Sequence, residues 1–398
     1  MKIVVIASIP YTFPLYQRIH HFTEMFVKEG HEVLFIEPIK FTKNERPKKN
    51  LEIWYPRVEG ASVFYIMKEK QHEWTMKYRG MYRFFQLMRL LGGFRLYRFL
   101  RDRYERKIHR VTHTKGFEDK VREKLAEKSR AKRKIAFFQF PHQVEHIPYL
   151  KELGYKIVYD MVDDIAEFDE VPRDIRAREI ELLKSADLVT TTATPLMETA
   201  RKYNNNVKLI PNGVEYKHFV KARGKLRKPK DMPRGKPIIG YYGAIWTWFD
   251  GDLLLYLAKK RPQYDFVLIG TMIESLRGKF GRKKNIRYLG EKKYHVLPAY
   301  LRCFDVAVVP FKDNNLTKAV NPVKIYEYLA GGKNVVYTGL KELGDFPCVH
   351  TGSNKEEILA KLDDCLGKRC DLGEIDIFLK DKTWVSRYAA LSRELKKL

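Results

Sequence analysis

A lysine and a glutamate one helical turn apart, Lys324 and Glu327, are the residues with the clearest potential for chemistry. The sequence predicts a helix over 322–330, because Asn321 and Pro322 are start signals and Gly331 is a stop signal. Free amides at the start of a helix attract a pyrophosphate. A lysine for the phosphates and a carboxylate for ribose hydroxyls would hold a nucleoside diphosphate by both ends. An exposed ion pair on a helix explains the same pattern equally well.

Three aspartates form a second group of candidate catalytic residues. Asp160, Asp163 and Asp164 stand at the end of a strand predicted over 156–161, at the sheet edge where ligands of parallel sheets bind. A carboxylate there could take a proton from a hydroxyl or stabilise a developing positive charge. A helix cap or an ion-pair partner is the alternative. His142, at another strand end, is a weaker catalytic candidate.

The elements that must position these residues alternate between strands and helices, which indicates the α/β class. Residues 221–236 are rich in Lys and Arg, contain Pro and Gly, and are predicted to be a linker. We expect two Rossmann-like, doubly wound domains, 1–220 and 237–376, that face each other across a cleft holding the active site. A last helix in 377–398 is expected to pack back on the first domain.

Length and composition agree with two globular domains. The chain has 398 residues and no run of about 20 apolar residues that could span a membrane. The first residues are typical of a buried strand rather than a signal peptide. The four cysteines show no CxxC or zinc spacing, so we expect inert thiols in a reducing cytoplasm and no metal site.

The net charge of +27 is unevenly distributed. Between residues 66 and 133 there are 21 Lys or Arg and 8 Asp or Glu, so the excess there is +13. Within 78–107 aromatic, aliphatic and arginine residues interleave, as in segments that lie in a membrane interface. An insertion over about 67–133 is therefore predicted to bind an anionic membrane surface at the cytoplasmic face. A helical pair packed on the sheet is the alternative.

Several segments together resemble a known enzyme family. Residues 321–333, NPVKIYEYLAGGK, are similar to the donor-binding segment of retaining glycosyltransferases of family four, which have the GT-B fold. Residues 210–214, IPNGV, and 288–290, YLG, match two further elements of that family. The segments QRIHH at 17–21, YDMVDD at 159–164 and WVSR at 384–387 are similar to a subgroup with teichuronic-acid glycosyltransferases.

The resemblance implies roles for single residues. Glu327 would bind the donor ribose and Lys324 its phosphates, Gly243 would admit the diphosphate, and Leu289 with Gly290 would line the base pocket. The predicted donor-binding residues are Gly243, Leu289, Gly290, Asn321, Pro322, Val323, Lys324 and Glu327. The family's first glutamate, eight residues before Glu327, is replaced here by Ala319. The sugar contact must then come from another residue, such as Asn315, Thr317, Lys318 or Asn321.

The resulting prediction is a metal-independent glycosyltransferase of the hexosyltransferase type. It would move a sugar from a nucleotide-sugar donor, with UDP favoured, to a lipid-linked or polysaccharide acceptor, and it would need no cofactor. A metal-binding DxD-type site, as in GT-A enzymes, fits the second-domain signature poorly. The alternative from another class is a basic nucleic-acid-binding protein, which rests on charge alone because no binding module is recognised; no nucleic-acid partner is expected.

Overall fold

The computed structural model describes residues 1–7, 16–36, 51–54, 115–127, 129–168, 171–338, 343 and 345–398. The chain forms two compact units. The first consists of Met1–Phe13, Phe26–Tyr159 and Glu170–Asp187, and the second of Pro14–Met25, Asp160–Asp169 and Leu188–Leu398. The predicted membrane segment 78–107 and most of the predicted insertion over 67–133 lie outside the described residues. The predicted domain boundaries stay a prediction.

The N-terminal half of the chain builds a seven-stranded sheet in the order β3-β2-β1-β4-β5-β6-β7. Its strands are β1 (Lys2–Ile6), β2 (Glu32–Ile36), β3 (Leu51–Trp54), β4 (Lys134–Phe138), β5 (Tyr155–Met161), β6 (Leu188–Thr191) and β7 (Val207–Leu209). Neighbours such as β1 and β4 pair in parallel. β1 is buried along its whole length, as expected for a parallel strand covered on both faces.

Helices connect these strands in the predicted alternation. Among the described residues they are α1 (Arg18–Lys28), α6 (Lys115–Ala126), α7 (Ile147–Glu152), α8 (Ile175–Ser185) and α9 (Thr194–Arg201), together with the 3-10 helices η1 (Pro141–His146) and η2 (Ile165–Glu167). α1 buries Ile19, Phe22 and Phe26, and these positions recur at the spacing of one helix face. Gly30 follows α1 at a φ of 79°, where a residue with a side chain would be strained.

The second sheet has six strands in the order β10-β9-β8-β11-β12-β13. They are β8 (Ile238–Tyr242), β9 (Asp265–Ile269), β10 (Ile286–Tyr288), β11 (Val306–Val309), β12 (Val335–Tyr337) and β13 (Val349–Thr351). All pairs are parallel. Counted from β8, this is the doubly wound strand order 3-2-1-4-5-6, whose direction reverses between β8 and β11. Ligands of such sheets bind at the carboxyl ends of the strands at this switch point.

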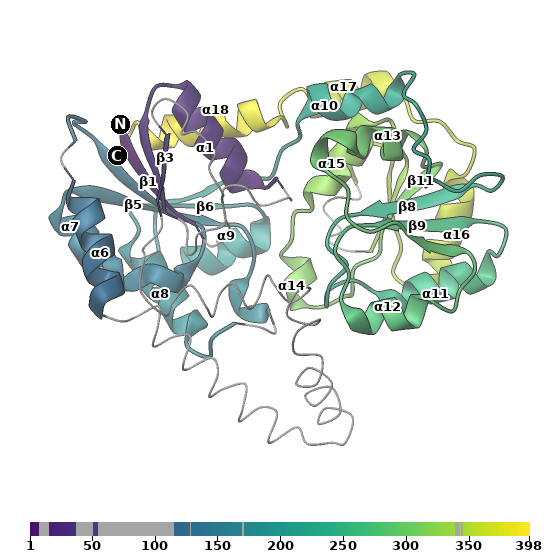
Figure 1. Cartoon of the computed structure of the whole chain (residues 1–398), viewed down its shortest axis with the longest axis horizontal. Helices are drawn as coiled ribbons and strands as arrows, with labels where there is room; N and C mark the ends of the chain where they lie inside the picture. The colour runs from purple at the N-terminus through teal and green to yellow at the C-terminus, as the bar shows by residue number, and fades with distance from the viewer. Residues whose placement is uncertain are drawn as a thin grey trace, which may run out of the picture. The chain divides into compact units, whose positions relative to one another are not determined.

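Helices cover both faces of the second sheet: Figure 1 shows α13 and α15 on one side and α11 and α12 on the other. The helices of this half are α10 (Tyr216–Phe219), α11 (Gly251–Lys260), α12 (Glu274–Phe280), α13 (Leu297–Arg302), α14 (Asn315–Lys318), α15 (Val323–Ala330), α16 (Lys355–Cys365), α17 (Leu372–Leu379) and α18 (Trp384–Leu395). α15 begins one residue after the predicted start, because Pro322 takes the N-cap position.

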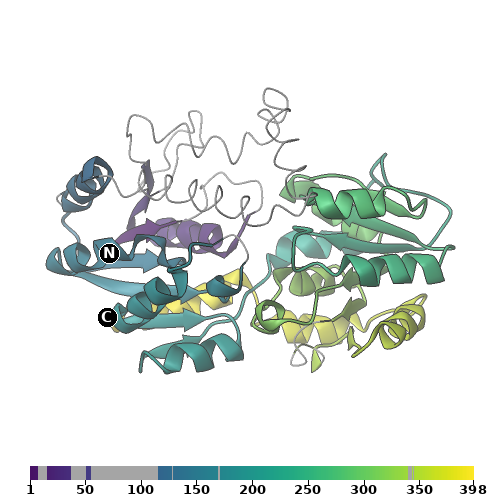
Figure 2. The same cartoon turned by 90° about the horizontal axis from the view of Figure 1, so that it is seen from below.

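The C-terminal helix α18 lies beside α1 in both views (Figures 1 and 2). Trp384 stacks on the ring of His21 at 4.5 Å and meets Phe22 edge-on, and Tyr388 also contacts Phe22. Thr383 caps the helix by accepting a hydrogen bond from the amide of Ser386. α18 is thus fixed by buried aromatic packing at its first two turns.

The predicted linker, 221–236, is held against α13. The hydroxyl of Tyr300 donates to Asp231 at 2.9 Å, Lys292 pairs with the same carboxylate at 2.8 Å, and Arg302 donates to the carbonyl of Gly224 at 2.8 Å. A segment with few apolar residues is therefore ordered by polar contacts made within the second unit.

The expectation of inert thiols is wrong for two of the four cysteines. Cys348 and Cys370 form a disulfide, with their Cα atoms 5.9 Å apart, whereas Cys303 and Cys365 are free. Folding brings the start of β13 beside the loop between α16 and α17, a proximity that spacing in the sequence does not reveal. No helix in the described part of the chain is both long and apolar enough to cross a membrane.

Candidate functional site

Three glycine turns follow neighbouring strands of the second sheet, and the first of them lies beside the switch point. Gly243, Gly270 and Gly290 follow β8, β9 and β10 with φ values of 139°, 133° and 70°, a region that favours glycine. A Cβ on Gly270 would lie 2.0 Å from the carbonyl oxygen of Gly243, and the amide of Gly270 donates to the carbonyl of Gly290 at 3.0 Å. The turns therefore pack backbone against backbone and form a surface of bare backbone, because a side chain on Gly270 would collide with the neighbouring turn.

The side chain of Lys324 passes directly over the first of these turns. A Cβ on Gly243 would lie 2.8 Å from its Cε and 3.4 Å from its Nζ. The ammonium also lies over the rings of Tyr241 and Phe311, 5.5 and 5.1 Å from their centroids. Burial lowers the pKa of Lys324 to about 8, although the charges of Glu327 and Asp163 favour protonation. A partly desolvated cation therefore stands beside the backbone surface.

Glu327 is buried one turn along α15, with 7% of its surface exposed. Burial raises the pKa of its carboxyl to about 7, while the hydroxyl of Tyr242 and the charge of Lys324 hold it down and Glu215 raises it. The Lys324–Glu327 pair is therefore not the exposed ion pair of the alternative interpretation. Such perturbed groups in a cluster are typical of functional sites.

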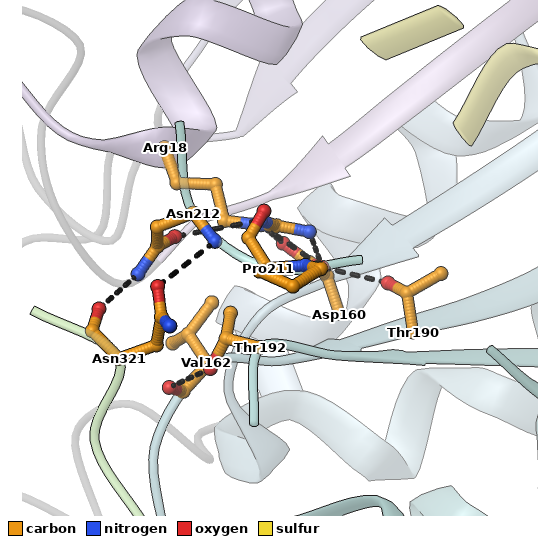
Figure 3. Close-up of polar contacts among 8 residues, drawn as sticks. All are labelled: Arg18, Asp160, Val162, Thr190, Thr192, Pro211, Asn212 and Asn321. Carbon is orange, nitrogen blue, oxygen red and sulfur yellow. Dashed lines mark hydrogen bonds and ion pairs between the residues drawn. The ribbon is translucent and has the colours of Figure 1, made fainter. Parts of the chain in front are cut away.

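Asp163 belongs to the same cluster of charges. Burial raises the pKa of its carboxyl to about 7, the nearby charge of Lys324 lowers it, and Asp164 raises it. The turn is held by a hydrogen bond from Thr192 Oγ1 to the carbonyl of Val162 at 2.8 Å (Figure 3). Asp164 stands at the start of η2 without capping it through its side chain.

Asp160 lies outside this cluster, in a buried ion pair. Its carboxylate receives Arg18 Nε at 2.8 Å and Thr190 Oγ1 at 2.6 Å, and Asp160 has no exposed surface (Figure 3). The structure thus separates the aspartates: Asp163 is near Lys324, and Asp160 is held by an arginine.

The start of α15 is joined to the loop after β7. Asn212 donates from Nδ2 to the carbonyl of Asn321 at 2.7 Å, and its amide donates to Asn321 Oδ1 at 3.2 Å (Figure 3). Asn321 also donates to the hydroxyl of Tyr326 at 3.0 Å. These contacts occupy Asn321, the residue preceding the N-cap Pro322, while Val323 is the first residue of the helix and half-buried.

The position of the family's first glutamate is buried and apolar here. Ala319 is 5% exposed and ends α14. Thr317 is committed to a capping box with Asn314, and the exposed Lys318 pairs with Asp313 at 3.0 Å. Asn315, the first residue of α14, is also exposed.

The remaining predicted residues lie in two places. Leu289 and Gly290 follow β10 and are half-buried; the amide of Leu289 donates to Leu268 at 2.9 Å. His142 lies in η1 in the other unit, where its carbonyl accepts from Arg178 at 3.3 Å. Within the described ranges no three His, Cys, Asp or Glu side chains gather closely enough to hold a metal ion.

Sequence reasoning missed several residues of this region. Gly270 directly follows β9 and could have been recognised as a second glycine turn beside Gly243. Arg18 was noted only as part of the QRIHH segment, and neither it nor Tyr242 was given a role, because only the packed structure shows that they contact Asp160 and Glu327.

Comparisons with known proteins support the fold. No family model matches the chain. Over its full length the chain is similar to alpha,alpha-trehalose 6-phosphate synthase from Burkholderia multivorans, with a TM-score of 0.67, 14% identity and 98% of that chain covered. The complex of Anabaena Alr3699/HepE with UDP-glucose has a TM-score of 0.64 at 12% identity and is covered completely. The chain has the GT-B fold.

A curated relative supports the resemblance within this fold. The chain is 25% identical over 211 residues to the "Putative teichuronic acid biosynthesis glycosyltransferase TuaH" of Bacillus subtilis (strain 168). The match covers 50% of this chain and 53% of the relative, so it spans about half the length of each. The GT-B fold and this similarity confirm the expected fold class.

Proposed function

We propose that this chain is a nucleotide-sugar-dependent glycosyltransferase with a UDP-sugar donor. The observation that supports this most directly is the position of Lys324. It lies at the start of α15 over the backbone of Gly243, beside the switch point of a doubly wound sheet. The free amides expected at the start of a helix and the ammonium of Lys324 supply the donors and the positive charge that binding of a diphosphate requires. A GT-B relative of the same fold has been solved with UDP-glucose.

The reaction follows from the groups in the cluster. The acceptor hydroxyl forms a bond to the anomeric carbon while the bond from that carbon to the diphosphate breaks, and UDP leaves with the electron pair. Lys324 and the amides of α15 stabilise the charge on the leaving diphosphate without a metal or cofactor. In an inverting displacement Asp163 takes the hydroxyl proton. In a retaining one Asp163 stabilises the positive sugar ring, and the hydroxyl proton passes to the leaving diphosphate.

Binding of the nucleotide tests this function. UDP at about 100 times its dissociation constant is expected to stabilise the chain by about 2.7 kcal/mol in a thermal unfolding assay. Glu327→Gln is expected to remove most of this shift, because the carboxylate that accepts ribose hydroxyls is lost. Glu356→Gln, at the start of α16, is the control that keeps the shift. Salt-sensitive DNA binding without any nucleotide shift would instead favour a nucleic-acid-binding protein.

We also propose a lipid-linked or polysaccharide acceptor at the cytoplasmic membrane face. The name of the TuaH relative and the net charge of +27 support it. The full chain is expected to float with vesicles containing anionic phosphatidylglycerol and to be released at about 0.5 M salt, because screening shortens the reach of surface charges. Neutral phosphatidylcholine vesicles are the control. Equal flotation with both kinds of vesicle would contradict an electrostatic attachment.

A further inference from the structure

Three charged residues have no role in the proposed reaction and are linked to the loop that contains Asn212. Arg18 and Arg387 contact Asn212 directly, and Asp160 is linked to it through Arg18. Arg18 and Asp160 form a two-point ion pair, with Nε to Oδ2 at 2.8 Å and Nη2 to Oδ1 at 3.0 Å (Figure 3). Arg18 is 4% exposed and Asp160 not at all. A buried pair of this kind has a fixed geometry, since the planar guanidinium matches the carboxylate in one orientation.

The third nitrogen of the guanidinium extends this geometry to the loop after β7. Arg18 Nη1 donates to the carbonyl of Pro211 at 3.1 Å and to Asn212 Oδ1 at 3.4 Å. Asn212 in turn makes two hydrogen bonds to Asn321, so the position of Asn321 depends on that of Asn212 (Figure 3). Lys324, in the first turn of α15, comes three residues after Asn321. Asp163, in the turn after β5, comes three residues after Asp160.

The same loop is clamped from the other side by the start of α18. Arg387 Nε donates to the carbonyl of Asn212 at 3.1 Å, and Val214 exchanges backbone hydrogen bonds with Lys382 and Trp384. A Cβ on Gly213 would lie 2.9 Å from the backbone of Thr383 and Trp384, so the close approach needs glycine. The loop therefore has little freedom to move away from Asn321.

We propose that Arg18 is a positioning residue, which acts through Asn212 to hold the start of α15 and the acidic turn in one arrangement. Arg18 touches neither Lys324 nor the bare backbone of the glycine turns. Its guanidinium connects the segment that carries Asp163 to the segment that presents Lys324. The effect of Arg18 on nucleotide binding rests on the proposed glycosyl transfer. The coupling of Arg18 to the start of α15 through Asn212 does not depend on that function.

Amide hydrogen exchange of the full chain without nucleotide tests the coupling. Arg18→Lys keeps a positive charge beside Asp160 but lacks the planar guanidinium, whose Nη1 also reaches the carbonyl of Pro211. Asn212→Asp keeps an acceptor for Arg18 but replaces the donor that faces the Asn321 carbonyl. Both variants are expected to speed exchange in residues 321–327 about tenfold, as for coupled neighbours in one network. Arg178→Lys, which alters an ion pair with Glu145 in the other unit, should leave 321–327 unchanged.

The outcome is decided by where exchange changes. If Arg18→Lys speeds exchange only within 16–22 and 157–162 and leaves 321–327 unchanged, the coupling through Arg18 is overturned, whatever Asn212→Asp does. If Arg18→Lys does not fold, Asn212→Asp decides: faster exchange in 16–22 as well as in 321–327 supports the coupling, and a change confined to 321–327 overturns it. When the wild type binds UDP, both variants should also weaken UDP binding about tenfold. A wild type that binds no nucleotide would refute the proposed function, while the exchange data would still decide the coupling.

Discussion

Replacing Lys324 with methionine is expected to lower kcat/KM for sugar transfer from a UDP-sugar by about 10²–10³-fold, the effect of removing a group that stabilises developing charge. Methionine retains most of the side chain that passes over Gly243 and packs on Tyr241 and Phe311, so the change removes the ammonium and little else. The measurement is the initial rate of UDP release with and without acceptor.

The pH dependence should change with the same substitution. The wild-type rate is expected to fall as pH rises through about 8, where Lys324 loses its proton, and to fall in acid as Asp163 and Glu327 are protonated near pH 7. Lys324→Met should lack the alkaline limb.

Stability should not fall with the rate. The folded-state pKa of Lys324 lies below the ordinary lysine value of about 10.4, so its charge costs stability below pH 8, and the cost disappears as pH rises past the unfolded value. Lys324→Met should therefore unfold at the same or a higher temperature at pH 7.

Lys279→Met is the matched control for the rate. Lys279 is an exposed lysine on α12 that pairs with Asp252, so its loss should change kcat/KM less than about twofold, as for surface ion pairs. A Lys324→Met enzyme with the wild-type rate and an intact alkaline limb would show that the lysine does not act on the leaving diphosphate.

Replacing Gly270 with alanine is expected to destabilise the chain by about 2–5 kcal/mol and to abolish UDP binding in the fraction that folds. Two costs add. The backbone φ of 133° is strained for alanine, and the new methyl would lie 2.0 Å from the Gly243 carbonyl oxygen, which is backbone and cannot rotate away. Any relief must separate the two turns that form the proposed diphosphate surface. Urea unfolding and UDP titration measure the two effects.

Gly278→Ala gives the opposite result if the explanation is correct. Gly278 lies inside α12, and a Cβ there would meet nothing within 4 Å. Alanine should stabilise that helix by about 0.5–1 kcal/mol, and UDP binding should not change. A Gly270→Ala chain as stable as the wild type would show that the turn rearranges without cost, and that the close contact with Gly243 does not require glycine.

Local patterns were enough to predict the helix that carries Lys324 and Glu327 and the strands that precede the site. The helix start at Asn321–Pro322 depends on neighbouring residues only, so it was predicted within one residue. Buried strands such as β1 and β8 were visible as apolar runs between turn signals. The alternation of these elements also predicted the doubly wound sheets, which the structure confirms.

Patterns did not separate residues of one type. Asp160 and Asp163 are three positions apart at the end of one predicted strand and were equal candidates. The fold places one against Arg18, 142 positions away, and the other near Lys324. The disulfide between Cys348 and Cys370 was missed for the same reason, since it depends on the meeting of β13 with a distant loop.

The sequence by itself thus determined the type of fold and the helix expected to bind a nucleoside diphosphate, because periodicity, capping and turn residues act over a few positions. Only the tertiary structure decided which charges are paired, which are desolvated and which backbone turns touch. Burial, charge and hydrogen bonding depend on distances between segments far apart in the chain. They shift the pKa values of Lys324, Glu327 and Asp163, and they join Arg18 to α15 through Asn212.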